Sequence, residues 1–226
     1  INLAGSSIFS RWNKKTKEKI FNSRILTTRN LVAPLLQDKG NVKKIISASA
    51  VGYYGYRDSS PIDESAGPGK DFLSTLCQCW EQEAIVAEQA DISVAMCRFG
   101  IILGKHGGSL QELVNNANKY IGGYVGKGTQ MVSWIHIEDL IKSIIFIMEK
   151  DISGPVNCCS PFSVTNKELT RLVAKILHKP ILIPKVPGFL LRIILGEFSS
   201  VLLKGQNAYP EKLLKNEFSF TFEKIE

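Results

Sequence analysis

Hydrophobic and polar positions in the first half of the chain follow the order strand, helix, strand. Apolar runs rich in β-branched residues at 44–50 and 92–99 predict strands that are buried on both faces. Apolar residues recur at helical spacing over 16–36 and 72–89. Residues 1–5 are typical of the end of another buried strand. Because strands alternate with helices, we expect an α/β fold with a doubly wound parallel sheet.

The second half of the chain is less regular. The expected elements are a helix at 109–120, a glycine-rich stretch at 122–128, a helix opened by 133–139 that runs to about 150, a strand at 155–158 and a helix that begins at the capping box of Thr165 and Glu168. Prolines then mark a change of element, and an apolar helical pattern follows from Phe189. We therefore predict two parts, an α/β domain over 1–178 and a small, mainly helical appendage over 179–226.

Charge and composition narrow the classes of partner. The net charge is +7, and the densest basic run lies at 11–19, at the start of a predicted helix. Since no aromatic residues interleave with it and no nucleic-acid motif accompanies it, we interpret it as a solvated helix face. No apolar run reaches the roughly 18–20 residues that a membrane-spanning helix needs. We therefore expect no nucleic-acid partner and no membrane partner.

The five cysteines show no pairing or metal-ligand pattern. Cys77 and Cys79 stand two apart in a predicted helix and so point in different directions. Cys158 and Cys159 are adjacent at a predicted strand end. This usage predicts reduced thiols, no metal site and a cytoplasmic protein, because disulfides are rare in the cytosol.

Candidate chemistry gathers at the end of the strand at 44–50. Residues 45–55 read Ile-Ile-Ser-Ala-Ser-Ala-Val-Gly-Tyr-Tyr-Gly, an apolar opening that turns into serines, glycines and paired tyrosines. In open α/β sheets, ligands bind beyond the carboxyl ends of the strands. This position makes Ser47, Ser49, Tyr53 and Tyr54 candidate catalytic residues.

Several separated motifs carry a resemblance to a known family. They are Asn2-Leu-Ala-Gly5 with Arg11-Trp12, Ser23-Arg24, the segment 45–55, Arg98 and Gly100 through Gly104, and 133–139. Together they resemble the extended short-chain dehydrogenase/reductases, and within them the "epimerase family" proteins related to nucleotide-sugar epimerases. The resemblance implies a Rossmann-like fold and a cofactor, NADP or NAD. It places that cofactor against Leu3, Ala4, Gly5, Arg24, Ser47, Ala48, Arg98 and Gly100.

The resemblance also implies that part of the fold is missing. In dinucleotide-binding sheets the first strand leads into a Gly-x-x-Gly-x-x-Gly turn, and this sequence has none. The glycine-rich stretch at 122–128 follows a predicted helix and cannot replace it. We therefore expect an N-terminally truncated sheet without its first βαβαβ part. The full-length form is expected to bind NADP or NAD. The 226 residues of this chain are expected to bind either dinucleotide poorly.

The sequence lacks the catalytic pair that is usual in the resembling enzymes. The helix at 72–81 lacks the Tyr-x-x-x-Lys pair that moves a proton in the resembling enzymes. Ser49 or Ser47 would then hold the substrate oxygen, Tyr53 or Tyr54 would exchange the proton, and Gln130 and Trp134 would form the substrate wall. The predicted function is an NAD(P)-dependent oxidoreductase or epimerase acting on a small hydroxylated, nucleotide-sugar-like substrate. The alternatives are a non-catalytic NADP-binding or redox-sensing protein and an inactive fragment.

Overall fold

Three parallel strands form the centre of the molecule. The computed structural model describes residues 1–57, 60–105, 107–120, 123–182 and 185–225. In it β1 (Lys44–Ala50), β3 (Ser93–Phe99) and β8 (Gly154–Cys158) pair in parallel in the order β1-β3-β8. The chain start adds a parallel bridge beside β1, in which the backbone nitrogen of Asn2 donates to Ile46 at 2.8 Å. The predicted parallel sheet is confirmed.

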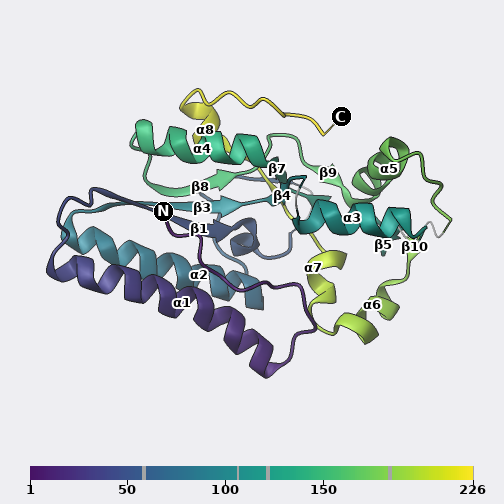
Figure 1. Ribbon diagram of the computed structural model, residues 1–226, viewed down its shortest axis with the longest axis horizontal. Coiled ribbons are helices and arrows are strands. Elements are labelled where there is room, and N and C mark those ends of the chain that lie inside the picture. Colours follow the sequence, from purple (N-terminus) through teal and green to yellow (C-terminus); the bar gives the residue numbers. More distant parts are fainter. Residues whose placement is uncertain (58–59, 106, 121–122, 183–184, 226) are drawn as a thin grey trace.

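Helices cover both faces of this sheet (Figure 1). On one face lie α1 (Lys14–Gln37) and α2 (Phe72–Ile85), which continues as the 3-10 helix η2 (Val86–Ala90). On the other face lies α4 (Ile137–Glu149). The fully buried Val94, Ala95 and Val156 lie in this sheet. The two-sided cover explains why the strands read as continuous apolar runs.

Short strands follow the central sheet on the side where β1 and β3 end. Strand β4 (Ile101–Leu103) pairs in parallel with β7 (Trp134–His136), and β6 (Met131–Val132) pairs antiparallel with β9 (Val164–Thr165). The helices α3 (Gly108–Asn118) and α5 (Asn166–Ile176) pack together beside them. The predicted helix opening at 133 was therefore wrong for its first four residues. Ser133 accepts a hydrogen bond from the nitrogen of Ile101, which holds this segment extended as a strand.

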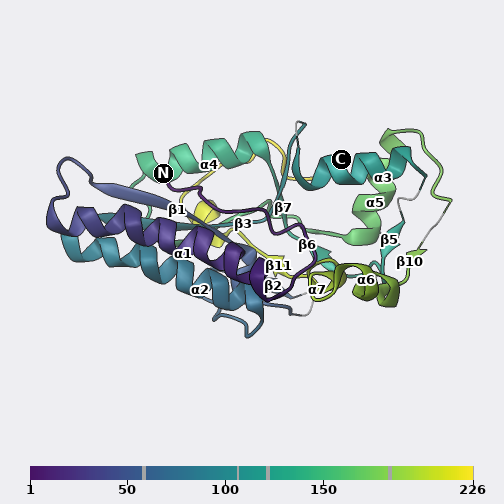
Figure 2. The same cartoon turned by 60° about the horizontal axis from the view of Figure 1, so that its bottom comes forward.

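The C-terminal part is helical and is joined to the rest by backbone pairing (Figure 2). Its helices are α6 (Gly188–Leu195), α7 (Ser199–Leu203) and α8 (Glu211–Lys215). Among its described residues, the short strands β10 (Lys185–Val186) and β11 (Asn207–Ala208) pair with β5 (Tyr124–Val125) and β2 (Pro61–Ile62) respectively. Leu213, Phe218 and Phe220 enter the same core cluster as the sheet and α4. The division at 178/179 therefore stays a prediction, because this part shares its core with the rest.

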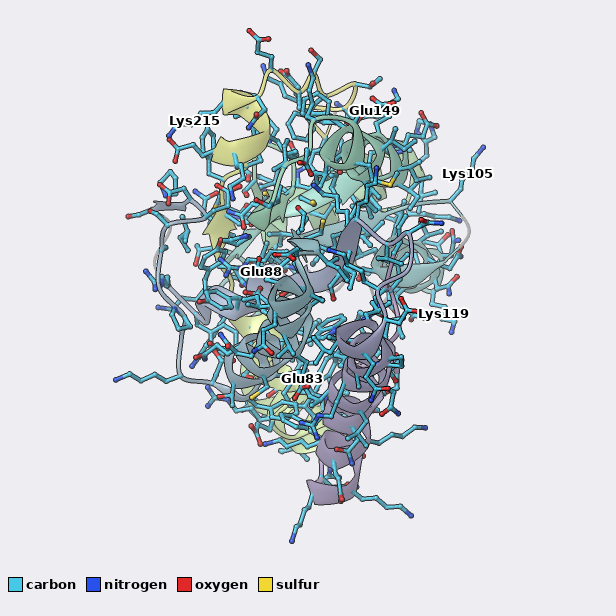
Figure 3. The ribbon with its side chains drawn as sticks, turned by 90° about the vertical axis from the view of Figure 1, so that its left-hand side faces the viewer. Glu83, Glu88, Lys105, Lys119, Glu149 and Lys215 are labelled. Carbon is cyan, nitrogen blue, oxygen red and sulfur yellow. The ribbon has the colours of Figure 1, made fainter. Side chains whose placement is uncertain are left out.

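The charged side chains lie mainly on the outside. Viewed from the end in Figure 3, Glu149 of α4 and Lys215 of α8 project from the surface, and both are exposed. No helix within the described ranges is long and apolar enough to cross a membrane. Gly122 of the glycine-rich stretch lies outside the described residues.

Candidate active site

A buried ion pair lies at the carboxyl end of the central strands. Arg98 stands on β3 and Glu81 on α2, and their side chains are only 3% and 6% exposed. Arg98 Nε donates to Glu81 Oε1 and Arg98 Nη2 donates to Glu81 Oε2, both at 2.8 Å. Ser49, which pairs with Arg98 across β1 and β3, donates through Oγ to Glu81 Oε1 at 2.6 Å. Glu81 thus accepts three hydrogen bonds, which offset the cost of burying its charge.

The ion pair extends to a tyrosine and an asparagine. Arg98 Nη1 donates to the hydroxyl of Tyr54 at 2.9 Å, and that hydroxyl donates to Asn157 Oδ1 at 2.7 Å. Asn157 Nδ2 in turn donates to the backbone oxygens of Ile62 and Tyr209. We call Ser49, Glu81, Arg98, Tyr54 and Asn157 the buried network. It connects β1, α2, β3 and β8 with the 3-10 helix η1 (Val51–Tyr54).

Electrostatics set the protonation states within the buried network. Burial raises the pKa of Tyr54 to about 12, although Arg98 opposes the change. Burial lowers the pKa of Arg98, but the hydrogen bonds and charge of Glu81 outweigh this and raise it overall. Tyr54 is therefore a neutral, hydrogen-bonded phenol near neutral pH, and only 1% of its surface is exposed.

Tyr53 differs from its neighbour. The Arg98 guanidinium carbon lies 3.4 Å from the Tyr53 ring centroid, and the rings of Tyr53 and Tyr54 meet edge to face at 5.5 Å. The Tyr53 side chain is only half-buried, and its hydroxyl has no hydrogen-bond partner among the described residues. Of the two candidate phenols, only Tyr53 is half-buried and has a hydroxyl without a hydrogen-bond partner in the described part of the chain.

The remaining strand residues are buried in the sheet. Ser47 is 1% exposed and lies beside the Asn2 bridge, and within the described ranges its hydroxyl donates only to the Ala48 oxygen, at 3.5 Å. Ala48 packs against Ile25 and Trp80 between the sheet and its helices. The structure therefore brings Ser49, Tyr53, Tyr54 and Arg98 together, with Ser47 nearer the chain start.

The predicted cofactor wall at the chain start is open. Leu3 is 59% exposed, Gly5 is exposed and Ala4 is half-buried. A side-chain carbon on Gly5 would lie 2.9 Å from Arg24 Cζ, so only glycine lets this guanidinium approach the backbone. Arg24 Nη1 donates to the oxygens of Ser6 and Ile20, and no described carboxylate pairs with it. Burial lowers the pKa of Arg24, yet a guanidinium stays charged at neutral pH.

Gly100 has a structural explanation. Its nitrogen donates to Cys158 at 3.0 Å, and a side-chain carbon there would lie 2.8 Å from the Ser133 oxygen. Glycine therefore lets β3 pass into β4 close against β7.

The two predicted substrate-wall residues face different cavities. Trp134 is 2% exposed, donates to the Phe162 oxygen at 2.9 Å, and lines an apolar cavity of about 210 Å³ between β7, α5 and the C-terminal tail. Gln130 lines a larger cavity of about 830 Å³ beside α6 and α7. Its Nε2 donates to the oxygens of Val125 and Leu202. The structure does not bring these two residues to one wall.

Two network residues, Glu81 and Asn157, were missed as site residues in the sequence. The signal was present for Glu81, which is a charge on the helix side that also carries the buried Cys77 and Trp80. Asn157 stands alone in the strand end at 154–158, so nothing in the sequence indicates its partners. Both positions become informative only once the helix and the strands are placed together.

The cysteines are free thiols. Burial raises the pKa of Cys77 to about 12 and raises the pKa of Cys159 well above its usual range. Contact with Cys97, together with burial, raises the pKa of Cys158. Neutral buried thiols are poor nucleophiles, which disfavours redox sensing through them.

Within the described ranges no group of three or more metal-ligating side chains occurs.

Comparison with known families agrees with this geometry. Residues 1–159 match the model of the NAD dependent epimerase/dehydratase family. The chain belongs to this family. Residues 186–226 match a second family model, a domain of unknown function called DUF1731. The part with the Rossmann-like sheet is therefore that of an epimerase-family protein, and α6 through α8 fall in the second match.

Curated relatives resemble the chain over its whole length. An epimerase family protein of Bacillus subtilis, YfhF, is 40% identical over 228 residues, which cover 100% of this chain and 75% of that protein. A chloroplastic homologue of SDR39U1 from Arabidopsis thaliana is 34% identical, and the match covers 100% of this chain and 65% of that protein. The chain thus spans about two thirds to three quarters of these relatives.

Solved structures share the fold. Human epimerase family protein SDR39U1, crystallised with NADPH, superposes with a TM-score of 0.90 and 26% identity over 99% of this chain and 77% of that one. A nucleoside-diphosphate sugar epimerase from Corynebacterium glutamicum has a TM-score of 0.75 and 30% identity over 96% of this chain and 43% of that one. A UDP-glucuronic acid 4-epimerase from Bacillus cereus, in complex with NAD, has a TM-score of 0.77 at 18% identity, which shows the shared fold alone.

Proposed function

We propose that the chain carries the catalytic part of an NAD(P)-dependent oxidoreductase or epimerase that acts on a small hydroxylated substrate. The observation that carries this proposal is the arrangement at the carboxyl ends of β1 and β3. There the buried network holds Tyr53 beside Arg98, and the chain start leaves an open wall at Leu3 and Gly5. The NADPH in the crystal structure of the human epimerase family protein SDR39U1 supports the cofactor.

The residues at the chain start fit a dinucleotide. Leu3 and Gly5 are exposed and Ala4 is half-buried, so a ligand could approach this segment. Arg24 offers a guanidinium with no described carboxylate partner. Guanidinium groups recognise phosphate oxygens through paired N–H donors. NADP or NAD would supply hydride transfer when bound against this wall.

Tyr53 is proposed as the group that exchanges the proton with the substrate oxygen. Its hydroxyl has no hydrogen-bond partner among the described residues, whereas those of Ser49 and Tyr54 already donate within the buried network. Arg98 packs on the Tyr53 ring and is itself fixed by Glu81, so the network positions the ring. Ser49 and Tyr54 would then act by positioning rather than by contact with substrate.

A second candidate is a non-catalytic NADP-binding protein of the same fold. It is favoured by the hydrogen bonds that occupy Ser49 and Tyr54 and by the lack of a lysine beside either tyrosine in the Tyr-x-x-x-Lys spacing. Both candidate functions require binding of the cofactor, so only a measurement of cofactor oxidation or substrate turnover can distinguish them.

The test is calorimetric titration of the full-length gene product with NADPH and with NADH. We expect Arg24→Met to weaken binding and Arg29→Met, a change on the same helix at an exposed ion pair with Glu83, to leave it unchanged. Absence of binding by either dinucleotide would overturn the proposal. Bound NADPH that is never oxidised across a panel of carbonyl and nucleotide-sugar substrates would favour the non-catalytic candidate. Tyr53→Phe should abolish turnover and keep cofactor affinity.

A further inference from the structure

The apolar cavity of about 210 Å³ that Trp134 lines is separate from the candidate active site, since none of the buried-network residues is among its described walls. Its walls come from β4, β7, α3, α5 and the C-terminal tail (216–225). The tail runs past α4 to the side of the molecule where α3 and α5 lie (Figure 1). Most of the lining side chains are apolar, among them Leu103, Leu110, Leu172, Ile176, Phe222 and Ile225.

The tail is held in place on both sides of Phe222. Asp139, at the start of α4, is fully buried. Its carboxylate accepts hydrogen bonds from the backbone nitrogens of Thr221 and Phe222 at 2.8–3.1 Å. On the other side, Ser160 donates through Oγ to the backbone oxygen of Glu223. These contacts fix the tail as one wall of the cavity.

The size of the cavity limits what fills it. Protein interiors are close-packed, so an apolar hollow leaves its lining without contacts that a ligand could supply. In another protein, an engineered cavity of about 150 Å³ lined by leucine, isoleucine and phenylalanine stays dry and binds benzene. The same space per carbon atom leaves room for about eight carbons in the 210 Å³ of this cavity.

The described residues that line the cavity include two ionisable side chains, and both offer hydrogen-bond donors. The Lys224 ammonium lies 5.6 Å from the Phe162 ring centroid and forms no ion pair with a described carboxylate. His136 Nδ1 accepts from the backbone nitrogen of Glu138 at 3.3 Å, so the ring proton is on Nε2, which has no partner among the described residues. The His136 ring packs on that of Phe222, with 3.9 Å between the centroids. An ammonium beside an N–H donor suits a carboxylate.

We propose that this cavity binds a small carboxylic acid of about eight carbons, either a short fatty acid or an aromatic acid. Its apolar part would lie against α3 and α5, and its carboxylate would meet Lys224 and His136. Such a site does not depend on the proposed function. Because Phe222 and Lys224 belong to the tail, a bound acid would connect the tail to α5 and make the protein more resistant to thermal unfolding.

Titration calorimetry of the full-length protein with octanoate and with phenylacetate, without cofactor, tests the site. Leu172→Trp should weaken the binding of both acids about tenfold or more, because the larger side chain occupies the cavity. Its matched control, Leu36→Trp, makes the same change at an exposed position on α1 and should leave the affinity unchanged. Lys224→Met should weaken binding about three- to tenfold, and Lys14→Met, at an exposed position on α1, should not.

Circular dichroism checks that the variants stay folded, and the exposed position of Lys224 keeps the test valid if Leu172→Trp does not fold. Failure of the wild type to bind either acid would overturn the site, and so would equal affinities of Leu172→Trp and Leu36→Trp. Octanol that binds as tightly as octanoate, or equal effects of Lys224→Met and Lys14→Met, would overturn the carboxylate assignment. Tighter binding of octanoate than of phenylacetate would identify a fatty acid as the ligand, and the reverse order an aromatic acid.

Discussion

Glu81→Gln removes one charge from the buried network and keeps the shape of the side chain. Glu81 accepts hydrogen bonds from Ser49 and twice from Arg98, and the ion pair is almost wholly buried. Breaking a buried pair leaves an uncompensated charge, which costs about 3–5 kcal/mol. Total stability of a domain is about 5–15 kcal/mol, so the loss is a large fraction of it. For a chain of this length, a loss of this size lowers the melting temperature by roughly 6–20 °C.

The assay is urea unfolding at neutral pH followed by tryptophan fluorescence, because Trp80 stands next to Glu81 on α2. Glu83→Gln is the matched control, since it removes the same charge from the same helix. Its partner Arg29 is 56% exposed, so this change should cost about 1 kcal/mol or less. The double change Glu81→Gln/Arg98→Met should recover part of the loss, because no unpaired charge then remains. A Glu81→Gln loss no larger than that of Glu83→Gln would refute the reasoning.

Three further predictions concern other parts of the molecule. Tyr54→Phe should lower the free energy of unfolding by about 1–3 kcal/mol at neutral pH, because it leaves two buried polar partners unpaired. The pKa of Tyr54 is raised to about 12 in the folded protein, above about 10 when unfolded. The stability difference between wild type and this variant should therefore be full below pH 10 and shrink as the pH rises toward 12. Gly205→Ala should cost about 1–3 kcal/mol through overlap with Met131, and Gly67→Ala, at an exposed site with open space, about nothing. A thiol reagent should modify Cys79 quickly and the four buried cysteines only on unfolding.

Each of these outcomes has a clear contrary result. A stability difference for Tyr54→Phe that stays constant from pH 9 to 12 would contradict the raised pKa. Equal unfolding curves for Gly205→Ala and Gly67→Ala would show that the appendage does not pack as described. Rapid modification of more than one thiol in the native protein would contradict the burial of the cysteines and would reopen the redox-sensing alternative.

The central sheet could be predicted because its strands are covered on both faces. Val94 and Ala95 are fully buried, and such strands read as apolar runs whatever their neighbours are. The capping box at Thr165 could also be predicted, because it depends only on residues three positions apart in the sequence. Both of its hydrogen bonds form. Strands β4, β6 and β7 were missed because two or three residues carry no periodicity.

The candidate site was only partly predictable for a different reason. Ser49, Tyr53 and Tyr54 follow one strand, so their position at its end could be expected from the sequence. Their hydrogen bonds depend on Glu81 and Arg98, which come from other elements and meet only when α2 packs on β3. The sequence could not tell Tyr53 from Tyr54, because the two adjacent tyrosines differ in burial, which depends on how the other elements pack around them.

The contact of Gly205 with the Met131 backbone, together with Leu203 between Gly126 and Gly188, also limits how the chain can be recombined. Family boundaries suggest that the C-terminal segment from 186 could be exchanged between relatives as a unit. The packing indicates a different unit, in which residues 124–131 are exchanged together with 185–208, because Gly126 and Met131 lie in close contact with Leu203 and Gly205. A chimera that takes one piece without the other should fold poorly or lose the cavity between them. These two stretches are therefore expected to have changed together in evolution, although more than fifty residues separate them in the sequence.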